Sequence, residues 1–210
     1  MSGDIVSLLA DLKEEEVLKL IKEKLAAGEN AIGILDDTRK AMEIVGKRFA
    51  GGDYFLPELI YSAEIMKQVA EIIKPKLGEA TEIKRLGKIV LGTVAGDIHD
   101  IGLNIVDFML DVNGFEVFNL GVDVPAQKFV EKLKETDAKI LALSGFLTLA
   151  FDAMKETVKA VEAAGLRNQI KIMIGGGQID EQIRKYSTAD AYGTDAMAAV
   201  SLAKQWTGNN

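Results

Sequence analysis

Gly96-Asp97-Ile98-His99-Asp100-Ile101-Gly102 stands between a strand-like apolar run, residues 88–95, and a helix-like run, residues 103–112. It contains the only histidine in a chain of 210 residues. Glycines at both ends let the backbone turn sharply and leave space for a bulky group. Asp97 comes two residues before His99, so its carboxylate can fold back and fix the tautomer of the imidazole. A carboxylate that orients a histidine is typical of metal sites, and the stretch predicts that His99 is a metal ligand.

The same seven residues also fit a purely structural interpretation. In it, Asp97 caps the helix that follows, and His99 is a buried histidine whose nitrogens are hydrogen-bonded to neighbours. The rest of the chain has to decide between the two.

After residue 87, apolar runs rich in β-forming residues alternate with helical runs. We expect strands over residues 89–93, 116–120, 140–143, 170–174 and 189–192, and helices over residues 102–113, 126–135, 151–164, 181–186 and 195–206. Five strands that alternate with five helices predict an α/β fold with a doubly wound parallel sheet. The expected strand order is the flavodoxin-like 2-1-3-4-5.

Sheets of this class bind ligands beyond the carboxyl ends of their strands, where the strand order reverses. In the expected order, that point lies between the first and third strands. The loop after the first strand carries His99, the loop after the third is Ser144-Gly145-Phe146-Leu147-Thr148, and Gly175-Gly176-Gly177 follows the fourth. A flavin phosphate or the acidic pocket of a receiver domain also fits such an edge, but neither calls for a lone histidine held by Asp97.

Residues 4–74 show helical periodicity throughout and predict four helices in a small antiparallel bundle. Asp11 with Glu14 matches a capping box, and Asn30 is a further cap. The apolar positions of the last helix follow the helical period and are expected to pack into the bundle: Leu56, Leu59, Ile60, Ala63, Met66, Ala70 and Ile73. Residues 76–87 carry charges without a sustained period and predict a linker between domains over residues 1–75 and 88–210.

Charge and composition argue against several classes of function. The formal net charge is −7, so nucleic acid is not an expected partner. The absence of cysteine rules out disulfides and thiolate metal sites. The sequence shows no targeting pattern at its start and no apolar run near the ~20 residues that span a bilayer. We therefore expect a soluble, cytoplasmic protein with no membrane partner.

These residues resemble the cobalamin-binding domain of methionine synthase and of the corrinoid proteins of methyltransferase systems. That family is marked by Asp-x-His-x-x-Gly, then a Ser-x-Leu segment, then Gly-Gly. The matching positions here are Asp97, His99 and Gly102, then Ser144 with Phe146 in the leucine place and Thr148 beyond it, then Gly175 and Gly176. Residues 192–196 (YGTDA) resemble the closing segment of the family, and residues 49–59 (FAGGDYFLPEL) resemble the helical cap that precedes the domain.

The resemblance implies a helical cap followed by a Rossmann-like sheet domain that binds a cobamide, either cobalamin or a related corrinoid. The cobamide would be bound base-off, with His99 as the lower ligand of cobalt and Asp97 as its hydrogen-bonding partner. No catalytic residue is expected. The glycines and Ser144 would leave room for the nucleotide tail, although the glycines also fit ordinary loop positions, and Phe49 and Leu56 would cover the reactive face, although both also fit bundle core. The expected cofactor contacts are Gly96, Asp97, Ile98, His99, Asp100, Ile101, Gly102, Ser144, Phe146, Leu147, Thr148, Gly175, Gly176, Tyr192, Gly193, Phe49 and Leu56.

One position departs from the methionine synthase branch of the family. That branch places a serine six residues after the position of Ser144, where it completes a proton relay with the aspartate and the histidine. Here the position is Ala150. A relay from His99 is therefore expected to stop at Asp97 or to pass to water.

The function that the resemblance implies is a corrinoid methyl carrier, which takes a methyl group onto cobalt and passes it on. Its partners would be a substrate-specific methyltransferase, an acceptor methyltransferase and a reductive activator, and the chain would not be an enzyme by itself. The donors open to it are methanol, methylamines, betaines and methoxylated aromatics, and the acceptors are tetrahydrofolate or a thiol. The alternatives are a cobalamin-dependent regulator or light sensor, the small subunit of a cobalamin-dependent mutase, and a storage or delivery protein for the cofactor. Mutase domains generally lack this cap.

Overall fold

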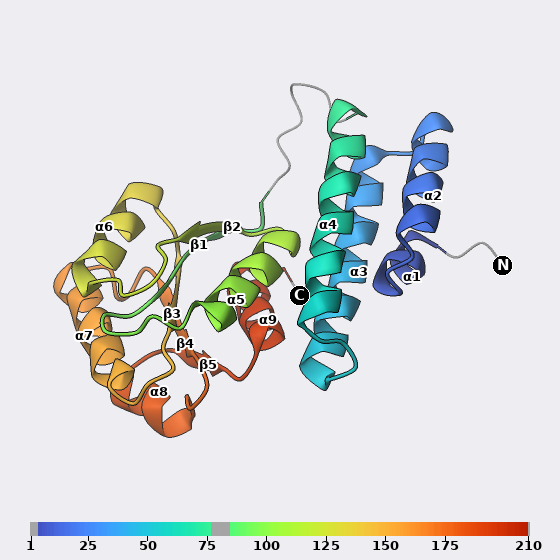
Figure 1. Ribbon diagram of the computed structural model, residues 1–210. Coiled ribbons are helices and arrows are strands. Elements are labelled where there is room, and N and C mark those ends of the chain that lie inside the picture. Colours follow the sequence, from blue (N-terminus) through green and yellow to red (C-terminus); the bar gives the residue numbers. More distant parts are fainter. Residues whose placement is uncertain (1–3, 77–84, 210) are drawn as a thin grey trace. The chain divides into compact units, whose positions relative to one another are not determined.

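The computed structural model describes residues 4–76 and 85–209 (Figure 1). The chain divides into two compact units, residues 1–84 and 85–210, which we call the helical unit and the sheet domain. Most of the predicted linker, residues 77–84, lies outside the described residues. The domain boundaries therefore stay a prediction.

The helical unit contains α1 (Ile5–Ala10), α2 (Glu14–Ala26), α3 (Ala31–Gly51) and α4 (Leu56–Ile73), followed by a short 3-10 helix, Lys74–Lys76. The Asn30 side chain accepts a hydrogen bond from the Ile32 N–H at 2.9 Å, which confirms the predicted cap of α3. Gly52, at φ 81°, ends α3 in the left-handed conformation that favours glycine.

The predicted capping box of Asp11 and Glu14 is wrong. Asp11 follows α1 as its carboxyl-terminal cap, whereas α2 begins after Lys13 with no side-chain cap. The Asp11 carboxylate instead accepts a hydrogen bond from Arg48 at 2.9 Å, and the same Nη1 donates to the Ala10 carbonyl at 2.6 Å. Because α1 ends at Ala10, the Ala10 carbonyl has no partner within the helix. Arg48 from α3 supplies a hydrogen bond to it.

The predicted inner face of α4 is wrong in part. Leu56, Ile60 and Ala70 are exposed, and the buried positions of α4 are Leu59, Ser62, Ile65, Val69 and Ile73. A helix with apolar residues on most sides has two overlapping rows of apolar residues that both follow the helical period. Its sequence therefore does not show which row is buried. Packing against α2 and α3 selects one row and leaves Phe55, Leu56 and Ile60 outside, a surface that we call the α4 face.

The sheet domain has the predicted architecture. Its strands are β1 (Lys88–Thr93), β2 (Glu116–Asn119), β3 (Ile140–Ser144), β4 (Lys171–Gly175) and β5 (Ala191–Gly193). Its helices are α5 (Asp100–Val112), α6 (Ala126–Thr136), α7 (Ala150–Ala163), α8 (Glu181–Ser187) and α9 (Ala196–Thr207). All strand pairs are parallel and the order is β2-β1-β3-β4-β5. Figure 1 shows α5 and α9 on one face of the sheet and α6, α7 and α8 on the other.

Helices on both faces explain why the central strands are nearly continuous apolar runs. Five of the six residues of β1 are buried, as are the first four of β3. Thr93 pairs with Ser144, and Ser144 pairs with Gly175, so β1, β3 and β4 end at the same level. The loops that follow these strands therefore leave the sheet side by side.

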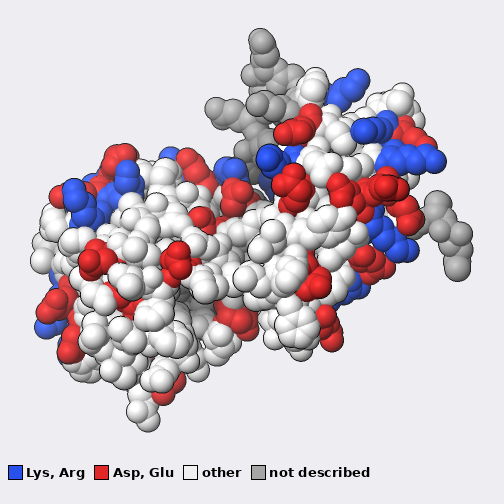
Figure 2. Space-filling model, in the orientation of Figure 1, with Lys and Arg blue, Asp and Glu red and all other residues white. Residues whose placement is uncertain are grey.

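Acidic and basic side chains are interspersed over both units on the face drawn in Figure 2. In the described part of the chain, no helix combines the length and the apolar character needed to cross a bilayer.

Candidate cofactor site

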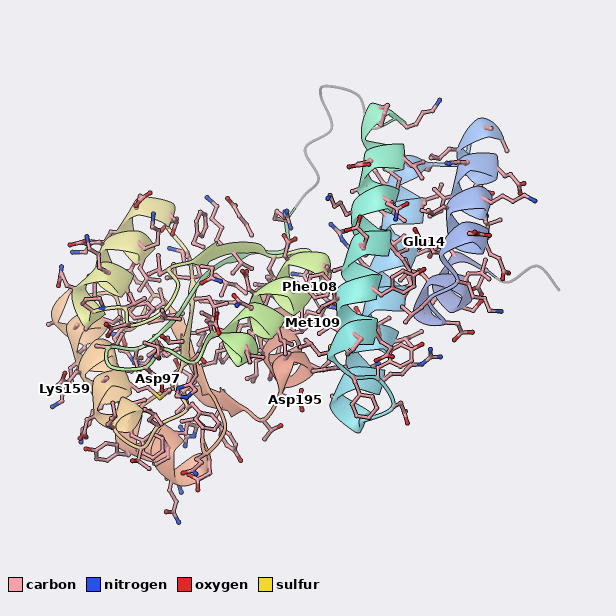
Figure 3. All side chains as sticks on the ribbon, viewed as in Figure 1. Glu14, Asp97, Phe108, Met109, Lys159 and Asp195 are labelled. Atoms are coloured by element: carbon pink, nitrogen blue, oxygen red, sulfur yellow. The ribbon has the colours of Figure 1, made fainter. Side chains whose placement is uncertain are left out.

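The centre of the site is the carboxylate of Asp97, which has no solvent-accessible surface (Figure 3). Its Oδ1 accepts hydrogen bonds from the backbone N–H of His99 at 3.0 Å and from Nδ1 of the same residue at 2.9 Å. Its Oδ2 accepts from the N–H groups of Phe146 at 2.6 Å and Leu147 at 3.1 Å. One buried side chain therefore joins the loop after β1 to the loop after β3.

The hydrogen bonds to Asp97 outweigh the cost of its burial. Burial alone raises the pKa of a carboxyl group, because it penalises the charged form. The N–H groups of His99, Leu147 and Phe146, together with the His99 ring, lower the pKa of Asp97 to about 2. Asp97 is therefore a carboxylate at neutral pH and acts only as an acceptor.

This carboxylate fixes the tautomer of His99. Since Asp97 can only accept, Nδ1 must carry the proton, and the neutral imidazole keeps its lone pair on Nε2, on the far side of the ring. The His99 side chain is 46% exposed, and the residue stands directly before α5. The structural alternative is wrong on both counts, because α5 has no side-chain cap from Asp97 and the histidine is not buried.

Two residues that the sequence analysis missed hold this loop in place. The Thr93 hydroxyl donates to the carbonyl of Asp97, and the Asp123 N–H donates to the same carbonyl at 2.9 Å. The Asp123 carboxylate accepts from the Gly96 N–H at 2.7 Å. A threonine at the end of an apolar strand is a signal that could have identified Thr93, whereas nothing in the sequence marked Asp123.

The loop after β4 meets the loop after β3 through backbone atoms. The Gly145 N–H donates to the Gly175 carbonyl at 3.0 Å. Gly176 has φ 141°, and a Cβ there would lie 1.8 Å from the Gly145 carbonyl oxygen. Only glycine fits this position. Whether Gly175 and Gly176 also leave room for a nucleotide tail stays a prediction.

The segments that carry His99 and Phe146 also carry exposed apolar side chains. Ile98 and Ile101 are 70% and 67% exposed, and Phe146 and Leu149 are also exposed. The rings of Phe146 and His99 lie 4.7 Å apart between centroids, and Leu149 approaches Gly96. We call these four apolar residues the histidine face.

The remaining predicted contacts fall into two groups. Asp100, Gly102, Ser144, Thr148, Tyr192 and Gly193 lie at the carboxyl ends of the strands or at the start of α5. Gly175 pairs with Gly193, so the end of β5 continues the same edge. The half-buried Phe49 and the exposed Leu56 belong to the helical unit.

Ala150 is fully buried as the first residue of α7. The Oδ2 atom of Asp97 accepts its hydrogen bonds from two backbone N–H groups. Whether a relay from His99 stops at Asp97 or passes to water stays a prediction; Asp97 itself has no solvent-accessible surface, whereas His99 is partly exposed.

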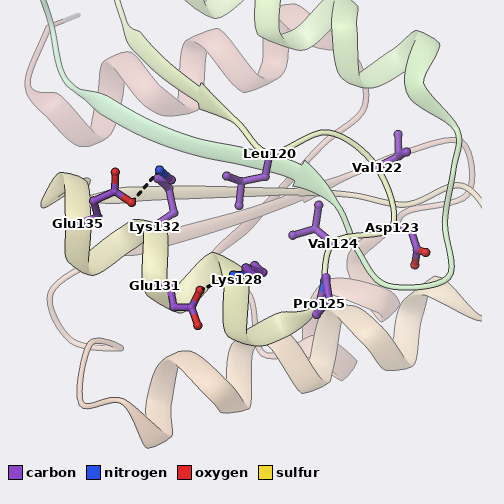
Figure 4. Close-up of a pocket in the computed structure, with 9 residues that line it drawn as sticks. All are labelled: Leu120, Val122, Asp123, Val124, Pro125, Lys128, Glu131, Lys132 and Glu135. Atoms are coloured by element: carbon purple, nitrogen blue, oxygen red, sulfur yellow. Dashed lines mark hydrogen bonds and ion pairs between the residues drawn. The ribbon is translucent and has the colours of Figure 1, made fainter.

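A pocket of about 340 Å³ lies elsewhere in the sheet domain, between α6 and the segment that precedes it (Figure 4). Its lining combines apolar residues of that segment with the ion pairs Lys128–Glu131 and Lys132–Glu135. None of the predicted cofactor contacts lines it.

The residues around His99 fit a cobamide. They offer one imidazole nitrogen with its lone pair free of Asp97, which suits a metal that brings its other ligands, as cobalt in a corrin ring does. The residues before and after His99 in the sequence include the exposed apolar side chains Ile98 and Ile101. Such a surface suits a large flat macrocycle.

Comparison with known proteins supports the same ligand. Two family models described as B12-binding domains match residues 3–74 and 87–201. The chain is 38% identical to trimethylamine corrinoid protein 1 of Methanosarcina acetivorans, over 92% of this chain and 90% of that protein. A crystal structure of a cobalamin-binding protein from Desulfitobacterium hafniense matches with a TM-score of 0.83 and 39% identity, over 96% of both chains.

A chain of the methanol:cobalamin methyltransferase complex MtaBC from Methanosarcina barkeri matches with a TM-score of 0.81 and 28% identity. The match covers 98% of this chain and 79% of that one. From the predicted motifs, the geometry around His99 and these relatives, we conclude that the chain belongs to the B12-binding corrinoid proteins.

Proposed function

We propose that this chain is a corrinoid methyl carrier that binds a cobamide base-off, with His99 as the lower ligand. The observation that carries the proposal is the pair Asp97–His99, in which a buried carboxylate holds the proton on Nδ1 and leaves Nε2 for a metal. When bound, the cobamide supplies a cobalt centre that takes up and releases a methyl group.

The residues of the sheet domain would divide the work of binding. Nε2 of His99 would ligate the metal, and the histidine face would pack against the apolar macrocycle. The hydroxyls of Ser144 and Thr148 would hydrogen-bond the nucleotide tail, and Gly175 and Gly193, which pair at the same edge of the sheet, would leave room for it.

The helical unit would form a domain of its own that shields the methyl group from water. Its α4 face offers the apolar surface for this task, because Phe55, Leu56 and Ile60 are exposed. Phe49 is half-buried, so we assign it a smaller part in this shield.

The names of the relatives favour methylamines as the donor class. Those relatives are called trimethylamine and dimethylamine corrinoid proteins. The more distant structural relative forms a complex with a methanol methyltransferase. We therefore propose a methylamine-specific methyltransferase as the first partner. The other partners would be a second methyltransferase, whose acceptor is tetrahydrofolate or a thiol, and a reductive activator.

Reconstitution with a cobamide tests the binding proposal. Electron paramagnetic resonance of the cobalt(II) form should show a nitrogen lower ligand that is lost in His99→Ala. The surface substitution Lys159→Ala on α7 serves as the control and should leave the signal unchanged. Persistence of the nitrogen signal in His99→Ala would overturn the ligand assignment.

Methyl-transfer assays test the donor class. The reconstituted chain should accept methyl groups from mono-, di- or trimethylamine in the presence of the matching methyltransferase, and not from methanol with its own enzyme. Transfer from methanol alone would contradict the donor class and keep the carrier function. No transfer from any of these donors would contradict the proposed methylamine carrier.

A further inference from the structure

Phe146 makes three contacts that converge on the predicted metal ligand. Its backbone N–H donates to Oδ2 of Asp97 at 2.6 Å. Its ring lies 4.7 Å from the His99 ring between centroids, with an interplanar angle of 35°. A Cβ added at Gly177 would lie 2.4 Å from Cε2 and 2.7 Å from Cδ2 of the same ring. The ring therefore contacts the imidazole and also fills the space in which a side chain at position 177 would stand.

These contacts give the imidazole a support that Asp97 alone does not provide. The hydrogen bond at Nδ1 fixes one atom of the ring, but a half-exposed ring held at one atom can still tilt about it. An aromatic ring packed against one face of the imidazole restricts that tilt. Leucine, which the family pattern has at this place, offers no flat face.

We propose, building on the proposed function, that Phe146 is a positioning residue that sets the orientation of the His99 ring, and that Gly177 is glycine in order to admit the Phe146 ring. Gly177 does not lie in the left-handed region, so its backbone does not require glycine. The space occupied by the Phe146 ring accounts for it.

The first test uses the apo protein and the fact that His99 is the only histidine. In the NMR spectrum, the ring protons of His99 should show nuclear Overhauser contacts to the Phe146 ring and an upfield ring-current displacement. Phe146→Leu should remove the displacement and Phe146→Tyr should keep it. Phe151→Leu is the matched control, since its ring comes from the same segment but packs on the sheet-domain core. A His99 signal that is the same in parent and Phe146→Leu would overturn the proposal.

The second test distinguishes an effect of Gly177→Ala that acts through the Phe146 ring from a general effect on folding. Gly177→Ala should abolish the ring-current displacement of His99 in the parent by expelling the Phe146 ring. In the Phe146→Leu background, the same change should not move the His99 signals further, because the two residues act as one unit. Equal displacements of the His99 signals by Gly177→Ala in both backgrounds would overturn the assigned role of Gly177.

The third test concerns metal ligation in the cobamide-loaded protein. The share of cobalt(II) centres with a nitrogen lower ligand should fall in Phe146→Leu and Gly177→Ala and stay at the parental level in Phe146→Tyr. Equal shares in all variants would overturn the positioning role while leaving His99 as the ligand. If the parent itself lacks a nitrogen ligand, the proposed ligation fails, and with it the positioning of a ligand by Phe146. The apo contacts between the two rings would then describe packing only.

Discussion

The loops after β1 and β4 both carry glycines of the predicted cofactor site, but the two loops are held in different ways. The loop after β1 is fixed by a side chain, because Asp97 accepts two hydrogen bonds from His99 in its own loop and two from the loop after β3. The loop after β4 is fixed by backbone, because Gly176 lies directly against the Gly145 carbonyl.

Their glycines differ accordingly. A Cβ on Gly176 would collide with backbone, whereas a Cβ on Gly102 in the first turn of α5 would meet nothing within 4 Å. The fold alone explains Gly176. It does not explain Gly102. We propose that the space at Gly102 serves the cofactor, so that one glycine of the family motifs would serve folding and the other binding.

The largest expected effect comes from Gly176→Ala. A Cβ 1.8 Å from a backbone oxygen forces two loops apart, and we expect the free energy of unfolding to fall by about 3 kcal/mol or more. Gly165→Ala is the matched control, since φ is 74° there and nothing lies within 4 Å. It should cost only about 1–2 kcal/mol for the left-handed backbone. Urea unfolding measures the loss of stability in both variants. Equal losses would show that the contact between Gly176 and the Gly145 carbonyl does not explain the glycine at position 176.

Asp97→Asn should destabilise the sheet domain by about 2–3 kcal/mol. Asparagine has one acceptor oxygen where the carboxylate has two, so two of the N–H donors lose their partner in a buried site. Asp123→Asn is the control, because Asp123 is exposed. Its carboxylate accepts from the Gly96 N–H through one oxygen, which asparagine can replace. That change should stay within about 0.5 kcal/mol. Comparable losses in the two variants would show that Asp97 is not the residue that joins the loops.

Acid should weaken the contribution of Asp97. The pKa of Asp97 is about 2 in the folded protein, below its ordinary value of 3.8, so folding favours the deprotonated form. The stabilisation is complete above about pH 5 and is lost as the pH falls through the folded value, and it amounts to about 2 kcal/mol. The difference in unfolding free energy between parent and Asp97→Asn should narrow between pH 5 and pH 2. A difference that stays constant over this range would contradict the low pKa.

The smallest expected effect on stability comes from Gly102→Ala. The position is helical and open, so alanine should leave the apo protein unchanged or raise its stability by up to about 1 kcal/mol. Cobamide affinity should fall, because the methyl group occupies the space left for the ligand. Gly33→Ala in α3 is the control, as a helical glycine with nothing within 4 Å. It should give a similar change in stability without loss of affinity. Unchanged affinity in Gly102→Ala would show that Gly102 has no part in cofactor binding.

The sequence predicted the sheet order and the Asp97–His99 contact because both depend on strong local signals. Alternating strands and helices leave few topologies, and two residues of spacing bring a carboxylate back to an imidazole. It could not predict the face of α4, where two apolar rows have the same period. It also missed the Phe146 and Leu147 N–H donors, since every residue but proline offers such a group.

Asp97 contacts the backbone of residues 146 and 147 and makes no hydrogen bond with their side chains. The length of the segment from Ser144 to Ala150 is thereby constrained, because one inserted residue would move both N–H groups out of reach of Oδ2. The side chains it carries are not constrained by Asp97. The segment is thus a natural place for relatives, or for a designer, to alter what surrounds the histidine without disturbing how the loop is anchored.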